Sequence, residues 1–451
     1  MILINKLELI KLSVGMIGNS FAYMIFYFLL PVFYKEYVFK PSLSLLGLDN
    51  ILNTVSFSMI TIPFAISALV YIFSGHISDK TRTRFGRRRP YLLLVIPSAA
   101  CFIFLGLPPN ILISMGFPQN YILLLILGTL YVSLYRILYC NYIALYVDLT
   151  PPNQRVSASI SINLFGMIGT IATFIIPLVF EGMSSFLEIT ALVGSIYLLL
   201  MLFVFFLGPK EDLEKINKID LKEKIPGFFK SFKDSITDYN FKYYLSASFF
   251  FVLAYSLMTT VFMDFLKFKQ TYIPVEFWNI FLVLLIVAVF GFWFYSKMSK
   301  KRGKIPTFKI ALYIGFLVQP FMIFLGIAGS PLSLIIQLII VFAILLFVLL
   351  AVLTFQNAIL MDIAPPDKEA TYSGIWLFVS VIGMPVASGL VGLINDVFIN
   401  GPPILNFWIY RTGEYPGHDF AYALLLLIAS ISYFISYLFL RKVKYKEELN
   451  K

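Results

Sequence analysis

A single arginine, Arg136, lies near the middle of a long apolar run that covers residues 120–147. A guanidinium in an apolar interior is costly unless it faces a cavity or a partner, so it marks a candidate functional site. The same helical face carries further polar side chains at three- and four-residue spacings, namely Thr129, Ser133, Tyr139 and Cys140. Such an arginine can bind a carboxylate through two parallel hydrogen bonds. The alternative is a structural arginine tied to carbonyls within a helix bundle.

Two other apolar runs carry polar stripes of the same kind. The stripes are Asn19, Tyr23 and Tyr27 in the first run, and Tyr255, Ser256, Thr259, Thr260 and Asp264 in the run near residues 243–266. Hydroxyls, an amide and aromatic faces suit a cavity that hydrogen-bonds sugar hydroxyls and stacks on a sugar ring. For each of these side chains, packing within a bundle is the competing interpretation.

Membrane-spanning helices are the elements that must position these side chains. Of the 451 residues, 59% are apolar and only 13% are charged, whereas soluble domains are about 45–50% apolar. A spanning helix needs about 20 apolar residues. Twelve suitable runs are present, near residues 12–34, 51–74, 91–109, 120–147, 157–180, 188–208, 243–266, 277–297, 308–328, 331–361, 371–396 and 419–440. We therefore predict an all-α integral membrane protein with twelve transmembrane helices in two six-helix bundles.

The distribution of basic residues predicts the orientation of these helices. Of the 35 Lys and Arg residues, 29 fall in segments that are cytoplasmic if both termini are inside, and five fall outside. This is the positive-inside asymmetry of multi-pass proteins, and it accounts for the net charge of +11 without a nucleic-acid partner. We expect a multi-pass protein of the cytoplasmic (cell) membrane with both termini cytoplasmic and an uncleaved first helix.

Enzyme chemistry finds little support in the sequence. Only two His and two Cys residues are present, without the spacing of a metal site. No Ser-His-Asp set, and no Cys nucleophile near a His, can be assembled from them. There is also no Gly-rich nucleotide-binding loop, which excludes a self-powered ATP-driven pump. We predict no enzyme activity, no metal and no cofactor.

The chain repeats itself at an offset of 214 residues, which indicates two related halves. The coinciding pairs include Ala144/Ala358, Asp148/Asp362, Pro151/Pro365, Pro152/Pro366, Ser159/Ser373 and Gly169/Gly383. We predict an N-terminal bundle over residues 1–208, a polar cytoplasmic linker over 209–242, and a C-terminal bundle with a basic tail over 243–451. Part of the linker is either an amphipathic helix on the inner membrane face or a solvated tether.

The most informative motif is GHISDKTRTRFGRRRPY, which begins at Gly75. In it, Asp79 can sit against a helix N-terminus, where the helix dipole favours a carboxylate, and the arginines supply forked donors for carboxylates and carbonyls. A purely topogenic basic loop is the competing interpretation. The motif resembles the helix 2/3 loop of the glycoside-pentoside-hexuronide/cation symporters and the similar sucrose transporters, within the major facilitator superfamily. The matching residues are Gly75, Asp79, Lys80, Thr81, Arg82, Thr83, Arg84, Phe85, Gly86, Arg87, Arg89, Pro90 and Tyr91.

The resemblance implies two six-helix bundles that rock about a central cavity and open it to each side in turn. It also implies that the loop latches the two halves on the cytoplasmic side, with Asp79 directed at the start of a helix in the other half. The residues of this gate motif are Gly75, Asp79, Arg84, Gly86 and Arg88. In the second half, Gly291 matches Gly75 at an offset of 216, but Tyr295 stands in place of Asp79. We therefore expect the latch mainly from the first-half loop.

A secondary active transporter for a sugar or glycoside, coupled to protons, is the function that the resemblance implies. Sodium-coupled members of the family carry acidic residues in helices two and four, whereas residues 51–78 and 120–147 contain no Asp or Glu, which disfavours sodium. An anionic derivative such as a uronide would supply a counter-charge for Arg136. The alternative is a same-fold transporter of a non-sugar solute, such as an organic anion, a lipid-like amphiphile or a drug, acting as a uniporter or exporter. We expect a monomer in the lipid bilayer with a small-molecule substrate.

Overall fold

The structure is a computed structural model that describes most of the chain. The described residues are 5–150, 155–179, 186–211, 233, 236–270, 287, 290–291, 293–295, 297–299, 301–324, 331–363, 369–399 and 416–444. At some helical positions the backbone alone is described, including those of Gly75, Asp79 and Asp264. Most of the predicted linker, 209–242, and of the predicted span 277–297 lies outside the described residues.

The chain forms two compact units. Unit 1 consists of Met1–Leu45 and Ile62–Phe228, and unit 2 consists of Leu46–Thr61 and Phe229–Lys451. One helix, α5 (Leu52–Lys80), is shared between them, because its first residues belong to unit 2 and the remainder to unit 1. The domain bounds that the sequence suggests remain a prediction.

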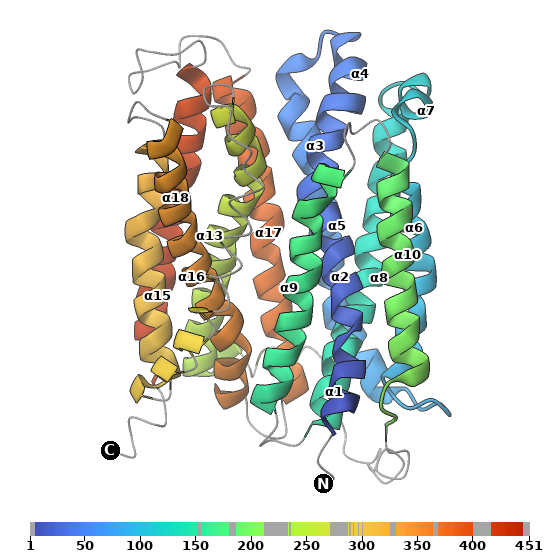
Figure 1. The fold of residues 1–451 in the computed structure, drawn as a ribbon, viewed down its shortest axis with the longest axis vertical. Coiled ribbons are helices and arrows are strands. Elements are labelled where there is room, and N and C mark those ends of the chain that lie inside the picture. The colour runs from blue at the N-terminus through green and yellow to red at the C-terminus, as the bar shows by residue number, and fades with distance from the viewer. Residues whose placement is uncertain are drawn as a thin grey trace. The chain divides into compact units, whose positions relative to one another are not determined.

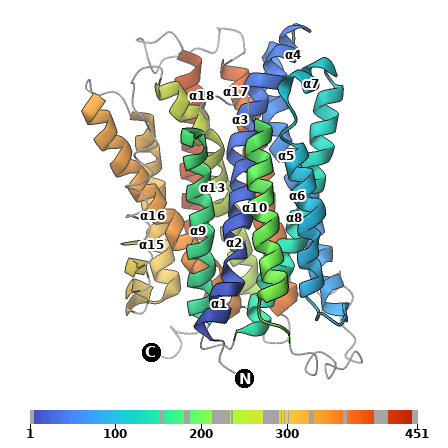
Figure 2. The ribbon, with the colours of Figure 1, turned by 45° about the vertical axis from the view of Figure 1, so that its right-hand side comes forward.

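Unit 1 is a bundle of long helices that run along a common direction (Figure 1). Besides α5, its elements are α1 (Lys6–Ser13), α2 (Gly15–Met24), η1 (Ile25–Leu29), α3 (Leu30–Tyr34), η2 (Lys35–Phe39), α4 (Lys40–Ser44), η4 (Arg89–Leu94), α6 (Val95–Phe104), α7 (Pro109–Ser114), α8 (Gln119–Leu149), α9 (Arg155–Val179) and α10 (Phe186–Leu207). Helix α6 packs against α8 and α10. Helix α2 packs against α9 and α10, and Figure 2 shows it between these two helices.

The first helical segment is longer than the apolar run 12–34 from which it was predicted. It continues through α3, η2 and α4 to Ser44. The two π-helical turns, η1 and η2, each end two residues before a proline, Pro31 and Pro41 respectively. Proline lacks an N–H and its ring clashes with the carbonyl four residues earlier, so a widened turn lets the helix pass it. The prolines therefore widen the helix locally instead of ending it.

Glycines allow α2 to approach its neighbours at backbone distance. A Cβ atom at Gly18 would lie 2.7 Å from the Cα of Tyr197 on α10. A Cβ atom at Gly169 on α9 would lie 2.1 Å from the carbonyl oxygen of Ile17. Small residues at such contacts let helices pack closely where the surrounding lipid offers no hydrophobic driving force. This packing fixes the position of the polar face of α2.

Unit 2 is a second bundle with its own close helix pairs. Its elements are η3 (Asp49–Ile51), the start of α5, α13 (Tyr239–Gln270), α15 (Lys304–Val318), η7 (Gln319–Phe324), α16 (Pro331–Ile363), α17 (Glu369–Ile399) and α18 (Pro416–Arg441). Helix α13 packs against α17 and α18, and α15 packs against α16 and α18. Asp396 of α17 caps the start of α5, since its carboxylate accepts the backbone N–H groups of Asn53 and Thr54 at 2.9 and 2.6 Å.

Many of the described helices are long and apolar enough to cross a bilayer. The seven long segments are Lys6–Ser44, Asp49–Tyr71, Gln119–Tyr146, Phe186–Leu207, Tyr239–Val261, Gly374–Ile399 and Ala421–Arg441. Shorter apolar helices cover Arg89–Phe104, Ser161–Thr173 and Ala343–Gln356. Named helices occupy eleven of the twelve predicted spans. In the span near 277–297, the described positions 287, 290–291, 293–295 and 297 are helical as well.

Candidate functional site

The side chain of Arg136 is buried in unit 1 among side chains from α2, α5 and α8. It is 5% exposed, and its Nη1 donates a hydrogen bond to the Tyr71 hydroxyl of α5 at 2.8 Å. Four aromatic rings surround the guanidinium. Its Cζ lies 4.9 Å from the ring centre of Phe64, 5.0 Å from that of Tyr71, 5.6 Å from that of Tyr23 and 5.9 Å from that of Tyr135. We call these five residues the arginine cluster.

Aromatic faces stabilise the buried charge of Arg136. Each ring carries a negative face that attracts a cation, by about 2 kcal/mol where both groups are desolvated. Without such contacts or a cavity, a charge in an apolar interior costs several kcal/mol. The arginine cluster therefore holds a positive charge and several N–H donors inside unit 1, at the middle of α8.

Polar and aromatic side chains of the first helical segment and of α8 extend the arginine cluster. Asn19 is fully buried, and its Nδ2 donates to the Tyr135 hydroxyl at 3.0 Å. The Tyr23 ring stacks on Tyr135 with centroids 5.3 Å apart, and on Tyr27 with centroids 6.1 Å apart. Tyr135 and Tyr139 stack at 5.9 Å. The result is a surface of aromatic faces with hydroxyl and amide groups at their edges.

Five of the candidates predicted from the sequence thus meet in unit 1, namely Asn19, Tyr23, Tyr27, Arg136 and Tyr139. Ser133, on the same helix as Arg136, is half-buried and takes no part in these contacts. Phe64 and Tyr71 were not among the predicted site residues, since aromatic side chains inside an apolar run form no polar stripe. Their seven-residue spacing, which places both on one face of a helix, is the signal that could have found them.

The α13 candidates belong to unit 2 and lie in a different environment. The Thr259 hydroxyl donates to carbonyls of its own helix, those of Tyr255 at 3.0 Å and Ser256 at 3.2 Å. Such local bonds satisfy a hydroxyl within the helix itself. Ser256 and Thr260 are buried, and Tyr255 is half-buried. The side chain of Asp264 lies outside the described residues.

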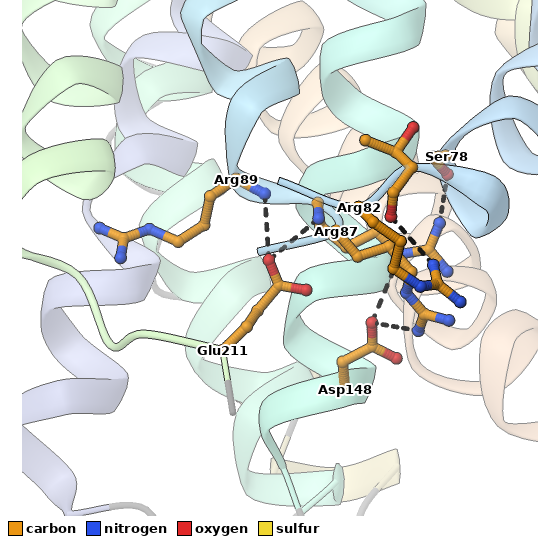
Figure 3. Close-up of polar contacts among 8 residues, drawn as sticks. Ser78, Arg82, Arg87, Arg89, Asp148 and Glu211 are labelled. Carbon is orange, nitrogen blue, oxygen red and sulfur yellow. Dashed lines mark hydrogen bonds and ion pairs between the residues drawn. The ribbon is translucent and has the colours of Figure 1, made fainter. Parts of the chain in front are cut away.

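The predicted gate loop forms a second group of charges in unit 1, which Figure 3 shows in close-up. Arg87 Nη2 and Arg88 Nε both contact Asp148 Oδ2, at 2.7 and 3.3 Å. The Arg88 guanidinium also donates to the Ser78 hydroxyl on α5. Because Asp148 lies near the end of α8, these contacts join the loop to the ends of α5 and α8.

Glu211, which follows α10, binds the backbone of the same loop (Figure 3). Its Oε2 accepts the N–H groups of Arg88 at 2.9 Å and Arg89 at 3.3 Å. The Arg89 guanidinium donates to the carbonyl of Phe205 on α10. Gly86 has φ +110°, and a Cβ atom there would lie 2.1 Å from Glu211 Oε2, so this turn requires glycine. We call Ser78, Gly86, Arg87, Arg88, Asp148 and Glu211 the loop cluster.

The loop cluster contains part of the predicted gate motif. Gly86 and Arg88 belong to it, whereas Arg84 is exposed and places its Cζ 4.8 Å from the Phe85 ring centre. At Gly75 and Asp79 the structure describes only the helical backbone of α5. Glu211 was not among the predicted site residues, because it begins the polar segment that the sequence assigns to the linker.

Unit 2 repeats one ion pair of the loop cluster. Lys304 Nζ lies 2.6 Å from Asp362 Oδ2. Asp362 is the counterpart of Asp148 at an offset of 214, and Lys304 is the counterpart of Arg88 at an offset of 216. In each unit, therefore, a carboxylate at the end of one long helix pairs with a cation of the loop two spans earlier.

Replacement of Glu211 by Ala is expected to destabilise the protein by about 1–3 kcal/mol, because two buried backbone N–H groups lose their acceptor. Glu211→Gln keeps a side-chain oxygen within reach and is expected to retain most of the stability. Thermal unfolding of the purified protein, followed by intrinsic fluorescence, measures the difference. Identical unfolding midpoints for the wild type and Glu211→Ala would contradict this role.

Solved structures with a similar fold are membrane transporters. A single-substitution variant of the nucleoside transporter NupG has a TM-score of 0.65 and 12% identity, with 97% of this chain and 100% of that chain covered. A bacterial homologue of the human lysosomal transporter Spinster, in an inward-facing and occupied conformation, has a TM-score of 0.64 and 16% identity, with 97% and 96% covered. At these identities the likeness concerns the fold alone. No curated protein sequence matches this one significantly.

A family model agrees with the structural likeness. The model described as Major Facilitator Superfamily matches residues 8–388, most of the chain. Together with the helices described above, it confirms the predicted fold class, an all-α membrane protein with twelve transmembrane helices in two six-helix bundles. The chain is therefore a multi-pass membrane transporter that belongs to the Major Facilitator Superfamily.

Proposed function

We propose that this protein is a secondary active transporter that moves a sugar or glycoside across the cytoplasmic membrane by alternating access, coupled to protons. The observation that carries the proposal is the arginine cluster, a buried guanidinium within a surface of tyrosine rings. Aromatic faces stack on the C–H face of a sugar ring, and Arg136, Asn19 and the tyrosine hydroxyls supply hydrogen bonds for its hydroxyl groups. The resemblance of the loop after the second span to that of glycoside symporters supports the same substrate class.

The sequence supports the orientation and the coupling ion of this proposal. The excess of Lys and Arg in alternate loops favours cytoplasmic termini, which places the loop cluster on the cytoplasmic side. The lack of acidic residues in 51–78 and 120–147 disfavours a sodium site there, and the proton is the coupling ion that we propose. Asp79 serves in this proposal as the latch of the loop, at the end of α5.

The second candidate is a transporter of an organic anion. The observation that favours it is the positive charge of Arg136 in an apolar interior, because a carboxylate of the substrate would bind the guanidinium through two parallel hydrogen bonds. A hexuronide would satisfy both proposals, since it combines a sugar ring with a carboxylate.

Charge movement in proteoliposomes tests both proposals. Purified protein in sodium-free liposomes, at equal pH on both sides, receives neutral glycosides and then uronides by rapid solution exchange, with protein-free liposomes as the control. Current together with acidification of the lumen on addition of a neutral glycoside would support proton-coupled sugar symport. A response to anionic solutes only would support the second candidate. Silence with both panels would contradict the sugar proposal and the uronide version of the second.

A further inference from the structure

We propose that unit 2 carries a binding site for one anionic glycerophospholipid, at the counterpart of the gate loop. A cavity of about 470 Å³ opens there between α15, α16 and the described helical residues 293–295, 297–299 and 301–302. Three exposed cations, Lys297, Lys301 and Arg302, line it. Among the described residues no carboxylate lines this cavity, and no ion pair of these three cations is seen.

The repeat between the two units explains why this site has excess positive charge. In unit 1, Asp148 contacts both Arg87 and Arg88. In unit 2, the counterpart of Arg88 is Lys304, which Asp362 contacts at 2.6 Å, while Gly303 replaces Arg87 at the offset of 216. In unit 2, therefore, Asp362 pairs with Lys304. The cations Lys297, Lys301 and Arg302 line the cavity.

Tyr295 adds an independent sign of a polar ligand. It stands where unit 1 has Asp79, lines the cavity and is only 2% exposed. Its hydroxyl has no hydrogen-bond partner among the described residues. A buried hydroxyl without a partner is costly. It is screened from solvent as the ring now lies, so in this proposal the Tyr295 ring turns toward the cavity and its hydroxyl donates to a phosphate oxygen of the lipid.

Apolar surface around the cavity selects a lipid in preference to a free anion. Phe294 and Phe347 line its wall, and Ile310, also in the lining, is 36% exposed. Beside the cavity, Trp293 is 57% exposed, and Lys297 Nζ lies 5.2 Å from its ring centre. Exposed Trp with a neighbouring Lys is typical of the membrane–water interface. An acyl chain can follow the apolar wall while the headgroup phosphate binds the cations.

Charge complementarity identifies the headgroup as anionic. A basic pocket between transmembrane helices, at the depth of the headgroups, is the arrangement that binds anionic lipids. With the orientation proposed above, the site lies in the cytoplasmic leaflet, at the end of unit 2 where α15 begins and α18 ends (Figure 1). Phosphatidylglycerol is a suitable probe, and phosphatidylcholine with the same acyl chains is the matched neutral lipid.

Native mass spectrometry of the full-length protein, titrated with either lipid in detergent, tests the site. The wild type is expected to bind phosphatidylglycerol at least tenfold more tightly than phosphatidylcholine. The variant Lys297→Gln/Lys301→Gln/Arg302→Gln is expected to lose about 100-fold in affinity for phosphatidylglycerol, at about fivefold for each charge. Tyr295→Phe removes one hydrogen-bond donor and should weaken binding severalfold without changing the net charge.

A variant with equal charge loss elsewhere in unit 2 is the matched control. Arg441→Gln/Lys442→Gln/Lys444→Gln removes three cations that lie over the rings of Tyr437, Tyr243 and Tyr239, and it should bind phosphatidylglycerol like the wild type. Equal losses in the two triple variants, or no preference between the lipids, would overturn the proposal. Displacement of phosphatidylglycerol by millimolar inorganic phosphate would overturn the lipid assignment and point to a free anion. None of these results depends on which solute is transported.

Discussion

Arg136→Ala is expected to reduce uptake about 100-fold or more, while the protein still inserts and folds. The guanidinium is buried among four aromatic rings and bonded to the Tyr71 hydroxyl. If it binds substrate through two charge-assisted hydrogen bonds, its loss removes roughly 3 kcal/mol, which equals about two powers of ten in affinity. Initial uptake rates in proteoliposomes that contain equal amounts of protein measure the effect.

Two further variants separate a substrate-binding role of Arg136 from a structural one. Arg136→Lys keeps the charge but replaces a planar fork by a point charge, so an anionic substrate should lose less affinity than a neutral glycoside. Tyr71→Phe removes one hydrogen bond and is expected to cost only about 1 kcal/mol. If Arg136→Ala unfolds at a much lower temperature than the wild type, or transports normally, the arginine is not a binding residue.

The α5–α8 contact connects the arginine cluster with the loop cluster. Ser74 of α5 accepts a hydrogen bond from Asn141 of α8 at 3.2 Å, between the pair Tyr71–Arg136 and the loop cluster. Arg136 and Asp148 are 12 residues apart on one helix, which spans roughly 18 Å. A helix of this kind moves as a rigid element. A shift of the loop that moves α8 would therefore also move Arg136.

The sequence is sufficient to predict the spans and the depth of Arg136. Apolar runs indicate how deep a residue lies, because every spanning helix needs about 20 apolar residues. The basic loop is equally recognisable, since a dense group of arginines between two apolar runs is typical of a cytoplasmic loop. The repeat identifies Asp362 as the counterpart of Asp148. In the structure, Asp148 contacts Arg87 in unit 1 and Asp362 contacts Lys304 in unit 2.

The sequence does not predict which helices pack against each other, and so it does not predict which side chains meet. Phe64 and Tyr71 come from a different helix than Arg136, and their rotation toward it depends on packing that a single sequence does not reveal. Glu211 lies more than 120 residues from Arg88 along the chain, and its polar surroundings resemble those of a linker residue. The first apolar run ends at residue 34, whereas the helical segment continues beyond that point through the π-helical turn η2 and through α4 to Ser44.

Gly169→Ala is expected to destabilise the protein by about 3 kcal/mol, the upper end of the cost of overpacking, because the added methyl group meets backbone. Its Cβ would lie 2.1 Å from the carbonyl oxygen of Ile17, and neither α2 nor α9 can move without separating the two helices. Gly166→Ala, one turn earlier on α9, is the matched control. Its Cβ would lie 3.0 Å from the Ser20 hydroxyl oxygen, which can rotate away, so this variant should unfold like the wild type. Thermal unfolding of the three proteins in the same detergent measures the effect. Because Ala has a higher helix propensity than Gly, propensity alone would stabilise both variants, and equal losses in both would contradict the role of the α2–α9 backbone contact.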